Sequence, residues 1–231
     1  MPLTFDLRTL FNLKGSPPIV VQQQHGEGDR LRLEFKHVDN RQKLTMARVF
    51  QGMRSEGAIY EYDPTRHAYT VTRADVLITV DLDERGRNHR MSFSRDGQPI
   101  SYITYEHAGN TITQRNYHYG REGTPFLSGM KVQTLDAQGR VKRSWNAADN
   151  RTDEYAYDND GFVSLHASMK PGGGTTRTQY QYVLGYEGNW VSRRTLTWDK
   201  RSRSYEQTGW TMRYFDFDVL GLFNNPFSNQ L

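Results

Sequence analysis

The sequence predicts an all-β protein, and three observations lead to this prediction. A short pattern, [Tyr/Leu]-Asp-x-x-Gly, occurs three times along the chain. Hydrophobic residues alternate with polar ones between the copies, and no long amphipathic helical pattern interrupts them. Period two bounded by Gly, Asn and Asp is typical of antiparallel hairpins, so we expect a twisted antiparallel meander of about ten to fourteen strands, arranged as a single curled sheet or an open barrel.

The three copies of the pattern read as tight turns. In such a turn the Asp side chain accepts hydrogen bonds from the backbone just ahead of it, and Gly supplies a positive φ at the end. The last copy has a hint of a calcium loop but lacks the Glu that closes one, so a plain turn is the better interpretation. The copies are Leu82-Asp83-Glu84-Arg85-Gly86, Leu135-Asp136-Ala137-Gln138-Gly139 and Tyr157-Asp158-Asn159-Asp160-Gly161.

The composition agrees with a sheet that water reaches on much of its surface. Hydrophobic residues make up 35% of the chain, below the roughly 45–50% of ordinary globular chains. The 14 Tyr and 4 Trp argue against disorder. An alternating strand needs only half of its side chains to be apolar, and Tyr and Thr suit half-exposed faces.

Charge and cysteine content exclude several classes of function. The net charge is only +4 from 30 basic and 26 acidic residues, so no general field for nucleic acid is implied. The absence of cysteine excludes disulfides, thiolate catalysis and Cys-ligated zinc. No apolar run is long enough for a membrane-spanning helix. The first residues show no signal-peptide pattern, which leaves a cytoplasmic location open.

The chain divides into three parts. Residues 1–18 are expected to form an apolar plug or short helix, which Pro17 and Pro18 end. Residues 19–218 are expected to form the hairpin domain, with turn glycines at 86, 97, 109, 139, 161 and 188. Residues 219–231 form an apolar tail that covers a sheet edge or, as the alternative, binds a partner.

Two of the turn copies resemble the RHS/YD repeat, namely those that run on into Gly161-Phe162-Val163 and Gly139-Arg140-Val141. Tyr186-Glu187-Gly188-Asn189-Trp190 resembles a variant of this repeat found in small bacterial envelope proteins. The resemblance covers residues 13–215 and implies β-hairpin architecture. It also implies a periplasmic or cell-envelope location, since the small relatives are often lipoproteins or secreted proteins.

The best candidate binding surface combines tryptophan with the densest basic run of the chain. That run holds Arg193, Arg194, Lys200, Arg201 and Arg203, with Asp199 among them. Aromatic and Arg residues are enriched at recognition sites, whereas burial in the core is the structural alternative for the tryptophans. The candidate binding residues are Trp190, Arg193, Arg194, Trp198, Arg201 and Trp210.

No catalytic or metal motif emerges, and no cofactor is implied. The seven histidines show no metal-ligand spacing, and Ser128-Gly129-Met130-Lys131 lacks the partner motifs of a serine hydrolase. We therefore expect a non-catalytic binding or scaffold protein of the bacterial envelope or of a secretion system, with a protein partner. The alternative is a carrier that holds a lipid or glycan in a curled sheet, and a hydrolase is the third hypothesis.

Overall fold

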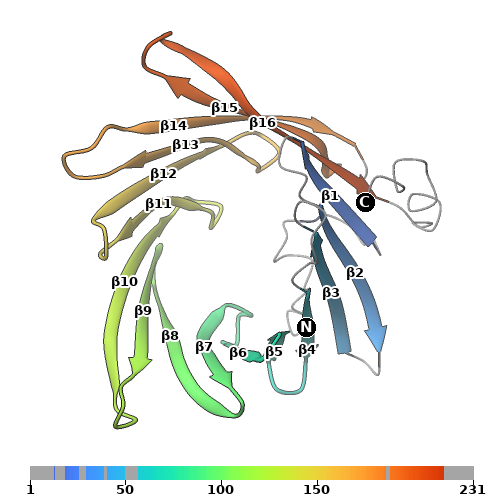
Figure 1. Ribbon diagram of the computed structural model, residues 1–231, viewed down its shortest axis with the longest axis vertical. Coiled ribbons are helices and arrows are strands. Elements are labelled where there is room, and N and C mark those ends of the chain that lie inside the picture. The colour runs from blue at the N-terminus through green and yellow to red at the C-terminus, as the bar shows by residue number, and fades with distance from the viewer. Residues whose placement is uncertain are drawn as a thin grey trace. The chain divides into compact units, whose positions relative to one another are not determined.

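The computed structural model describes residues 13, 19–25, 30–38, 41–49, 57–185 and 188–215. All regular elements within these ranges are β-strands, sixteen in number, and they form antiparallel hairpins (Figure 1). The all-β class and the antiparallel meander are thus confirmed. Within the same ranges there is no helix with the length and hydrophobicity needed to cross a membrane. The expected plug at 1–18, apart from buried Leu13, and the expected tail at 219–231 lie outside the described residues.

The chain falls into two compact units. Unit 1 comprises residues 1–74, 182–194 and 209–231, and unit 2 comprises residues 75–181 and 195–208. The strands that lie wholly in unit 1 are β1 (Ile19–His25), β2 (Arg30–Val38), β3 (Arg41–Val49), β4 (Gly57–Asp63) and β5 (Ala68–Arg73). The last two strands, β15 (Trp190–Asp199) and β16 (Ser204–Phe215), have residues in both units.

Unit 2 contains the longest uninterrupted run of hairpins. Its strands are β6 (Val76–Leu82), β7 (Asn88–Arg95), β8 (Gln98–Ala108), β9 (Thr111–Tyr119), β10 (Pro125–Leu135), β11 (Val141–Asn146), β12 (Arg151–Tyr157), β13 (Val163–Met169) and most of β14 (Thr176–Leu184). Each of these strands pairs antiparallel with the next. In unit 1, β1 to β5 pair in chain order and β1 also pairs with β16, through a register that runs from Val20↔Phe215 to His25↔Trp210.

The first Asp-x-x-Gly copy shows how the turns fix the register. The N–H of Gly86 donates to the carbonyl of Asp83 at 2.9 Å, and Gly86 has a φ of 73°. Asp83 Oδ1 accepts the N–H groups of Arg85 and Arg87, each at 2.9 Å, while Oδ2 accepts Arg87 Nε at 2.7 Å. The ladder shifts by one residue just before the turn, as in a bulged hairpin loop that ends on a left-handed Gly.

The charge of the Asp83 carboxylate contributes to this turn. Desolvation raises the pKa of Asp83, but hydrogen bonds from the side chain and backbone of Arg87 and from the backbone of Arg85 outweigh it and hold that pKa below its usual value. The second copy repeats the arrangement, with Arg140 Nε donating to Asp136 Oδ2 at 2.7 Å. These carboxylates act on their own backbone, as the sequence predicts for turns.

The third copy replaces the arginine with a buried aromatic side chain. Asp158 Oδ1 accepts the N–H groups of Asp160 and Phe162 at 3.1 and 2.8 Å. Phe162, in the position that Arg takes in the other copies, is only 2% exposed. The Arg140 guanidinium lies 4.3 Å from the centre of the Tyr157 ring, so the second and third turns contact each other.

The sixteen strands exceed the ten to fourteen expected because several turns do not use glycine. All six predicted turn glycines have positive φ, but so do five non-glycine residues, among them His67, Ala74 and Asn150. These three positions lie between β4 and β5, β5 and β6, and β11 and β12. A strand count based on turn glycines does not include such hairpins and is therefore too low.

The two units differ in what their sheets bury. In unit 1 the alternate residues of paired strands form an apolar face, with Leu44, Tyr62 and Tyr69 each at most 4% exposed. In unit 2 the face that contains buried Val80 also contains a polar row that crosses β10 to β13 in register: Gln133, Ser144, Asp153 and Ser168. The low hydrophobic content of the chain is explained by such polar sheet faces.

We predict that Gly139→Ala destabilises the protein. Gly139 has a φ of 78° and a Cβ placed there meets no atom within 4 Å, so the only penalty is the left-handed backbone. That conformation costs a residue with a Cβ about 1–2 kcal/mol. Urea unfolding should show this loss for Gly139→Ala and a smaller one for Gly139→Asn, because Asn tolerates the left-handed region.

The control is Gly120→Ala, at a glycine without positive φ where the nearest atom to a Cβ is at an ordinary 3.5 Å. It should stay within about 0.5 kcal/mol of the wild type. An equal loss in both variants would contradict the role given to the turn glycine.

Candidate functional site

The six sequence-predicted binding residues are divided between the two units. Trp190, Arg193, Arg194 and Trp210 belong to unit 1, and Trp198 and Arg201 belong to unit 2. Their assignment as binding residues stays a prediction. The arrangement within each unit nevertheless shows what chemistry each group can offer.

In unit 1, Trp190 is the centre of a buried cationic cluster. Its side chain is 4% exposed. The guanidinium carbon of Arg213 lies 3.8 Å from the centre of the indole ring, and that of Arg193 lies 5.4 Å from it. Tyr182 packs against the same ring at 6.0 Å. Trp190 therefore belongs to the core, and its ring makes cation–π contacts with two arginines.

Arg213 is the cation of this cluster that the sequence prediction missed. Burial, and then the like charge of Arg193, lower the pKa of Arg213 to about 10. The alternation of side chains between the two faces of β16 is a signal that could have identified Arg213. Thr211, which is 1% exposed and accepts a 3.4 Å hydrogen bond from Arg193, lies two residues before Arg213 and so shares its face of the strand.

Trp210 and Arg194 do not join this cluster through any contact that the structure records. The indole N–H of Trp210 donates to Ser192 Oγ at 2.7 Å. Trp210 precedes Thr211, so it points to the other face of β16. The Arg194 side chain is exposed. Trp190 and Arg193 are thus brought together, whereas Trp210 has a separate polar partner.

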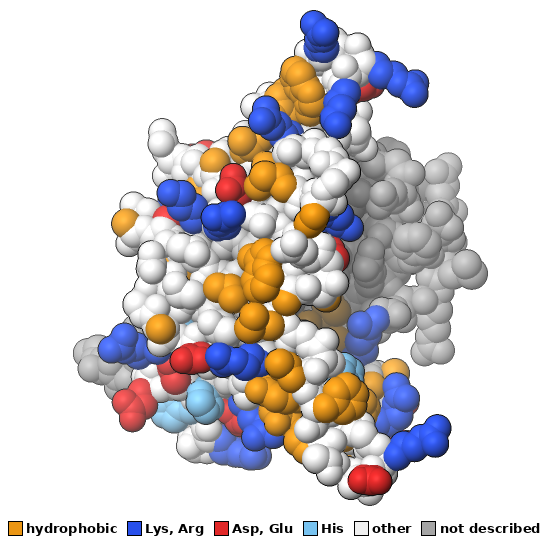
Figure 2. Space-filling model, turned by 90° about the vertical axis from the view of Figure 1, so that its left-hand side faces the viewer, with side chains coloured by type: hydrophobic (Ala, Val, Ile, Leu, Met, Phe, Trp, Pro, Cys, Tyr) orange, Lys and Arg blue, Asp and Glu red, His pale blue; other side chains and the backbone are white. Residues whose placement is uncertain are grey.

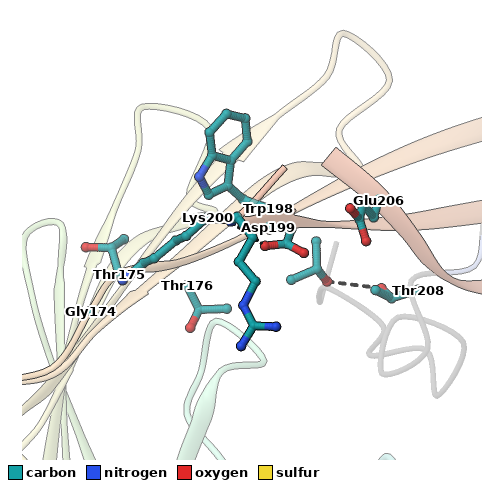
Figure 3. A pocket seen from close by; sticks show the side chains of 10 residues that line it. Gly174, Thr175, Thr176, Trp198, Asp199, Lys200, Glu206 and Thr208 are labelled. Carbon is teal, nitrogen blue, oxygen red and sulfur yellow. Dashed lines mark hydrogen bonds between the residues drawn. The ribbon is translucent and has the colours of Figure 1, made fainter. Parts of the chain in front are cut away.

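In unit 2, Trp198 and Arg201 line an open hollow of about 660 Å³ at the ends of two hairpins (Figure 3). One wall is the turn and first residue of β14, and the other is the β15–β16 hairpin. The lining residues are Gly174, Thr175, Thr176, Thr197, Trp198, Asp199, Lys200, Arg201, Glu206 and Thr208. The volume falls within the range of small-ligand pockets.

Eight of the ten residues that line the hollow are threonines or carry a charged side chain. Thr197 and Thr208 hydroxyls bond to each other at 3.0 Å. The Lys200 side chain extends toward Thr175 in Figure 3 and passes so close to Gly174 that a Cβ there would meet its ammonium group. Trp198 contacts Tyr205 edge-on at 5.2 Å, and its ring turns away from Thr176 and Thr208 (Figure 3).

Two of these lining residues, Trp198 and Arg201, are sequence-predicted binding residues, and Asp199 and Lys200 belong to the predicted basic run. The threonines were not predicted. Pro171 to Gly174 form the turn before β14, which is closed by a 3.1 Å hydrogen bond from the N–H of Gly173 to the carbonyl of Lys170. Thr175 and Thr176 follow the turn directly. Their position directly after a turn is a signal that the sequence contains. That this turn lies beside the β15–β16 hairpin can be seen only in the three-dimensional structure.

A third group of polar residues lies on the polar row of unit 2. Asp153, 8% exposed, contacts His166 Nε2 through Oδ1 at 3.0 Å and accepts Arg151 Nε through Oδ2 at 3.1 Å. The ring of His166 stacks on Tyr155 at 4.9 Å. Desolvation raises the pKa of Asp153, but hydrogen bonds from Ser168 and His166 and the charge of Arg151 outweigh it and lower that pKa.

This carboxylate is engaged on both oxygens, so it stabilises the sheet and offers no open position to a substrate. Ser144, its cross-strand neighbour, is 1% exposed, and its hydroxyl has no hydrogen-bond partner among the described residues. Elsewhere, His107 Nε2 lies 2.9 Å from the carbonyl of Asn88. Within the part of the chain that the structure describes, no three His, Asp or Glu side chains come together as metal ligands would.

Comparison with known proteins yields structural likeness only. No family model and no curated protein matches the sequence. A porin-like protein from Bacteroides vulgatus has a similar structure, with a TM-score of 0.58 and 10% identity over 87% of this chain and 98% of that chain. A porin-like protein from Bacteroides uniformis gives a TM-score of 0.54 and 8% identity over 87% and 96%. At such identities the likeness concerns the fold.

We predict that Asp153→Asn lowers the free energy of unfolding by about 2 kcal/mol at pH 7, because it removes a buried charge that accepts hydrogen bonds from Arg151, His166 and Ser168. The folded-state pKa of Asp153 is lowered, so this contribution is present above the unfolded pKa of about 3.9 and is lost as the pH falls through the folded value. Urea unfolding at pH 7 and pH 3 should show the difference between wild type and variant shrinking in acid.

Glu154→Gln is the matched control, since Glu154 is an exposed neighbour whose ion pair with Arg143 is 3.8 Å long. It should change stability by less than about 0.5 kcal/mol at both pH values. A difference between wild type and Asp153→Asn that stays constant from pH 7 to pH 3 would contradict the account.

Proposed function

We propose that the protein is a non-catalytic binding protein of the bacterial cell envelope. The observation that carries the proposal is the open hollow of unit 2, which has the size of a small-ligand site and contains two of the sequence-predicted binding residues, Trp198 and Arg201. Its hydroxyl and charged side chains offer hydrogen bonds to a polar ligand. A scaffold role for a protein partner belongs to the same proposal.

The envelope location rests on two lines of support. The small relatives of the RHS/YD type, which the turn copies resemble, are often secreted or lipid-anchored. The two porin-like proteins from Bacteroides share the fold of this chain at 8% and 10% identity. Porin-like describes those two proteins, and we extend only the envelope context to this chain.

The non-catalytic part of the proposal rests on how the acidic side chains are used. Asp83 and Asp136 cap their own turns, and Asp153 is engaged by His166, Arg151 and Ser168. General acid–base catalysis needs a group within hydrogen-bond reach of a substrate. The carboxylate and histidine that do meet, Asp153 and His166, satisfy each other on a sheet face. A hydrolase is accordingly the least favoured of the three hypotheses.

The carrier alternative is favoured by one observation, the polar row of unit 2. Of this row, Gln133 and Ser168 are half-buried and suit the hydroxyl groups of a glycan, whereas Ser144 and Asp153 are buried. A lipid chain gains free energy by contact with apolar surface, and this row does not supply it. Between the two ligands of that alternative, we therefore favour a glycan.

The location can be tested by cell fractionation. An epitope-tagged copy, expressed from its own locus in its bacterial host, should be found in the envelope or periplasmic fraction together with marker proteins of those compartments. A cytoplasmic enzyme is the control for cell lysis. Recovery of the tagged protein with that cytoplasmic enzyme would contradict the envelope assignment.

Binding can be tested on protein purified from the same host. Native mass spectrometry should detect a retained small molecule or a protein partner. A mass equal to that of the bare chain, from both gentle and detergent extraction, would contradict a binding function.

A further inference from the structure

The two hairpin ends that form the hollow of unit 2 concentrate positive charge. Residues 170–177 and 199–206 together contain five Lys or Arg and only two acidic residues, which gives a net charge of +3 against +4 for the whole chain. Figure 2 shows Lys and Arg side chains gathered at the top of the molecule, where the β15–β16 hairpin projects. Such a concentration attracts anions.

Half of the twelve arginines of unit 2 lie in an ion pair, whereas the arginines at the hollow do not. Arg87, Arg95, Arg115, Arg140 and Arg151 each lie within 3.1 Å of an Asp or Glu oxygen. Arg177, Lys200, Arg201 and Arg203 are exposed and have no ion pair with any described residue. The cations of the hollow are therefore available to a ligand.

The two acidic residues of these segments do not cancel this charge. Asp199 Oδ1 accepts the N–H of Arg201 at 2.6 Å and so caps the turn of its own hairpin. Glu206 is exposed on the lining, without an ion pair in the described part of the chain. The fifth cation, Lys170, is already held by Asp149 at 3.5 Å. Lys200 and Arg201 are the two cationic residues that line the hollow itself.

The other lining residues favour a ligand that is larger than a simple anion and carries hydroxyl groups. Four threonines contribute hydroxyl groups, which both donate and accept hydrogen bonds. The volume of about 660 Å³ is far larger than a phosphate or sulfate ion needs and suits a molecule of one or two sugar rings. An apolar lipid chain would leave these hydroxyls and charges without partners.

We propose that the hollow binds an acidic saccharide, an inference that rests on the binding function proposed above. Lys200 and Arg201 hold its carboxylate, sulfate or phosphate group. The hydroxyls of Thr175, Thr176 and Thr208 bond to its ring hydroxyls. Arg177 and Arg203 add to the field that draws the ligand in.

The test is isothermal titration calorimetry with digalacturonic acid, a sulfated disaccharide, a phosphorylated disaccharide, neutral digalactose, inorganic sulfate and inorganic phosphate. At least one acidic disaccharide should bind more tightly than digalactose and both inorganic ions, and its affinity should fall as salt is raised. Which of them binds identifies the anionic group. The double variant Lys200→Gln/Arg201→Gln should lose about tenfold or more in affinity for it, since charge-assisted hydrogen bonds are lost.

Arg121→Gln, at an exposed arginine in the β9–β10 turn, is the matched control and should bind as the wild type does. A double variant of unchanged thermal midpoint and unchanged affinity overturns the inference. So does equal binding of digalactose, binding of the inorganic ions alone, or binding of none of the probes.

The failure of this inference and the failure of the proposed function can be told apart. If a ligand retained from the host stays bound to the double variant, the binding function stands and the hollow is the wrong site. If the host protein retains nothing and no saccharide binds, both fall.

Discussion

The structure depends on one constraint, the pairing of alternating strands in a register that tight turns fix. A slip by one residue would turn every side chain of a strand to the other face. The Asp-x-x-Gly turns oppose such a slip. In each, Asp caps two backbone N–H groups, and a left-handed Gly sets the bulge at which the ladder shifts. Local hydrogen bonds at these turns thereby help to decide which side chains share a face.

That constraint explains how a chain with 35% hydrophobic residues keeps an ordered sheet in unit 2. The row through Ser144 and Asp153 lies where a more apolar protein would place Val or Leu. It is stabilised by charge-assisted hydrogen bonds among Asp153, His166 and Arg151. Unit 1 follows the more usual solution, with an apolar face around Leu44 and Tyr62. The same antiparallel pairing thus supports two kinds of buried face.

The sequence was sufficient for the fold class and for the turns because both are local. Period two and the glycine positions needed no knowledge of distant contacts, and the six turn glycines have the expected positive φ. The turns at Ala74 and Asn150 were not predicted, since they lack the glycine on which the turn prediction relied. The candidate site could be predicted from the sequence only in part. The contact of Arg213 with Trp190, and the place of the threonines near Arg201, depend on which strands lie side by side. The register between two hairpins cannot be predicted from the sequence of either strand alone.

Hairpin ends, held in place by fixed turns, form the proposed ligand site of this protein. Hydrogen–deuterium exchange of the backbone amides, measured with and without the acidic disaccharide that binds, can test this proposal. We expect slower exchange at residues 172–176 and 197–208, with unchanged exchange at the 83–86 and 136–139 turns. Protection confined to the Trp190–Arg194 stretch, or no change in exchange at all, would contradict it.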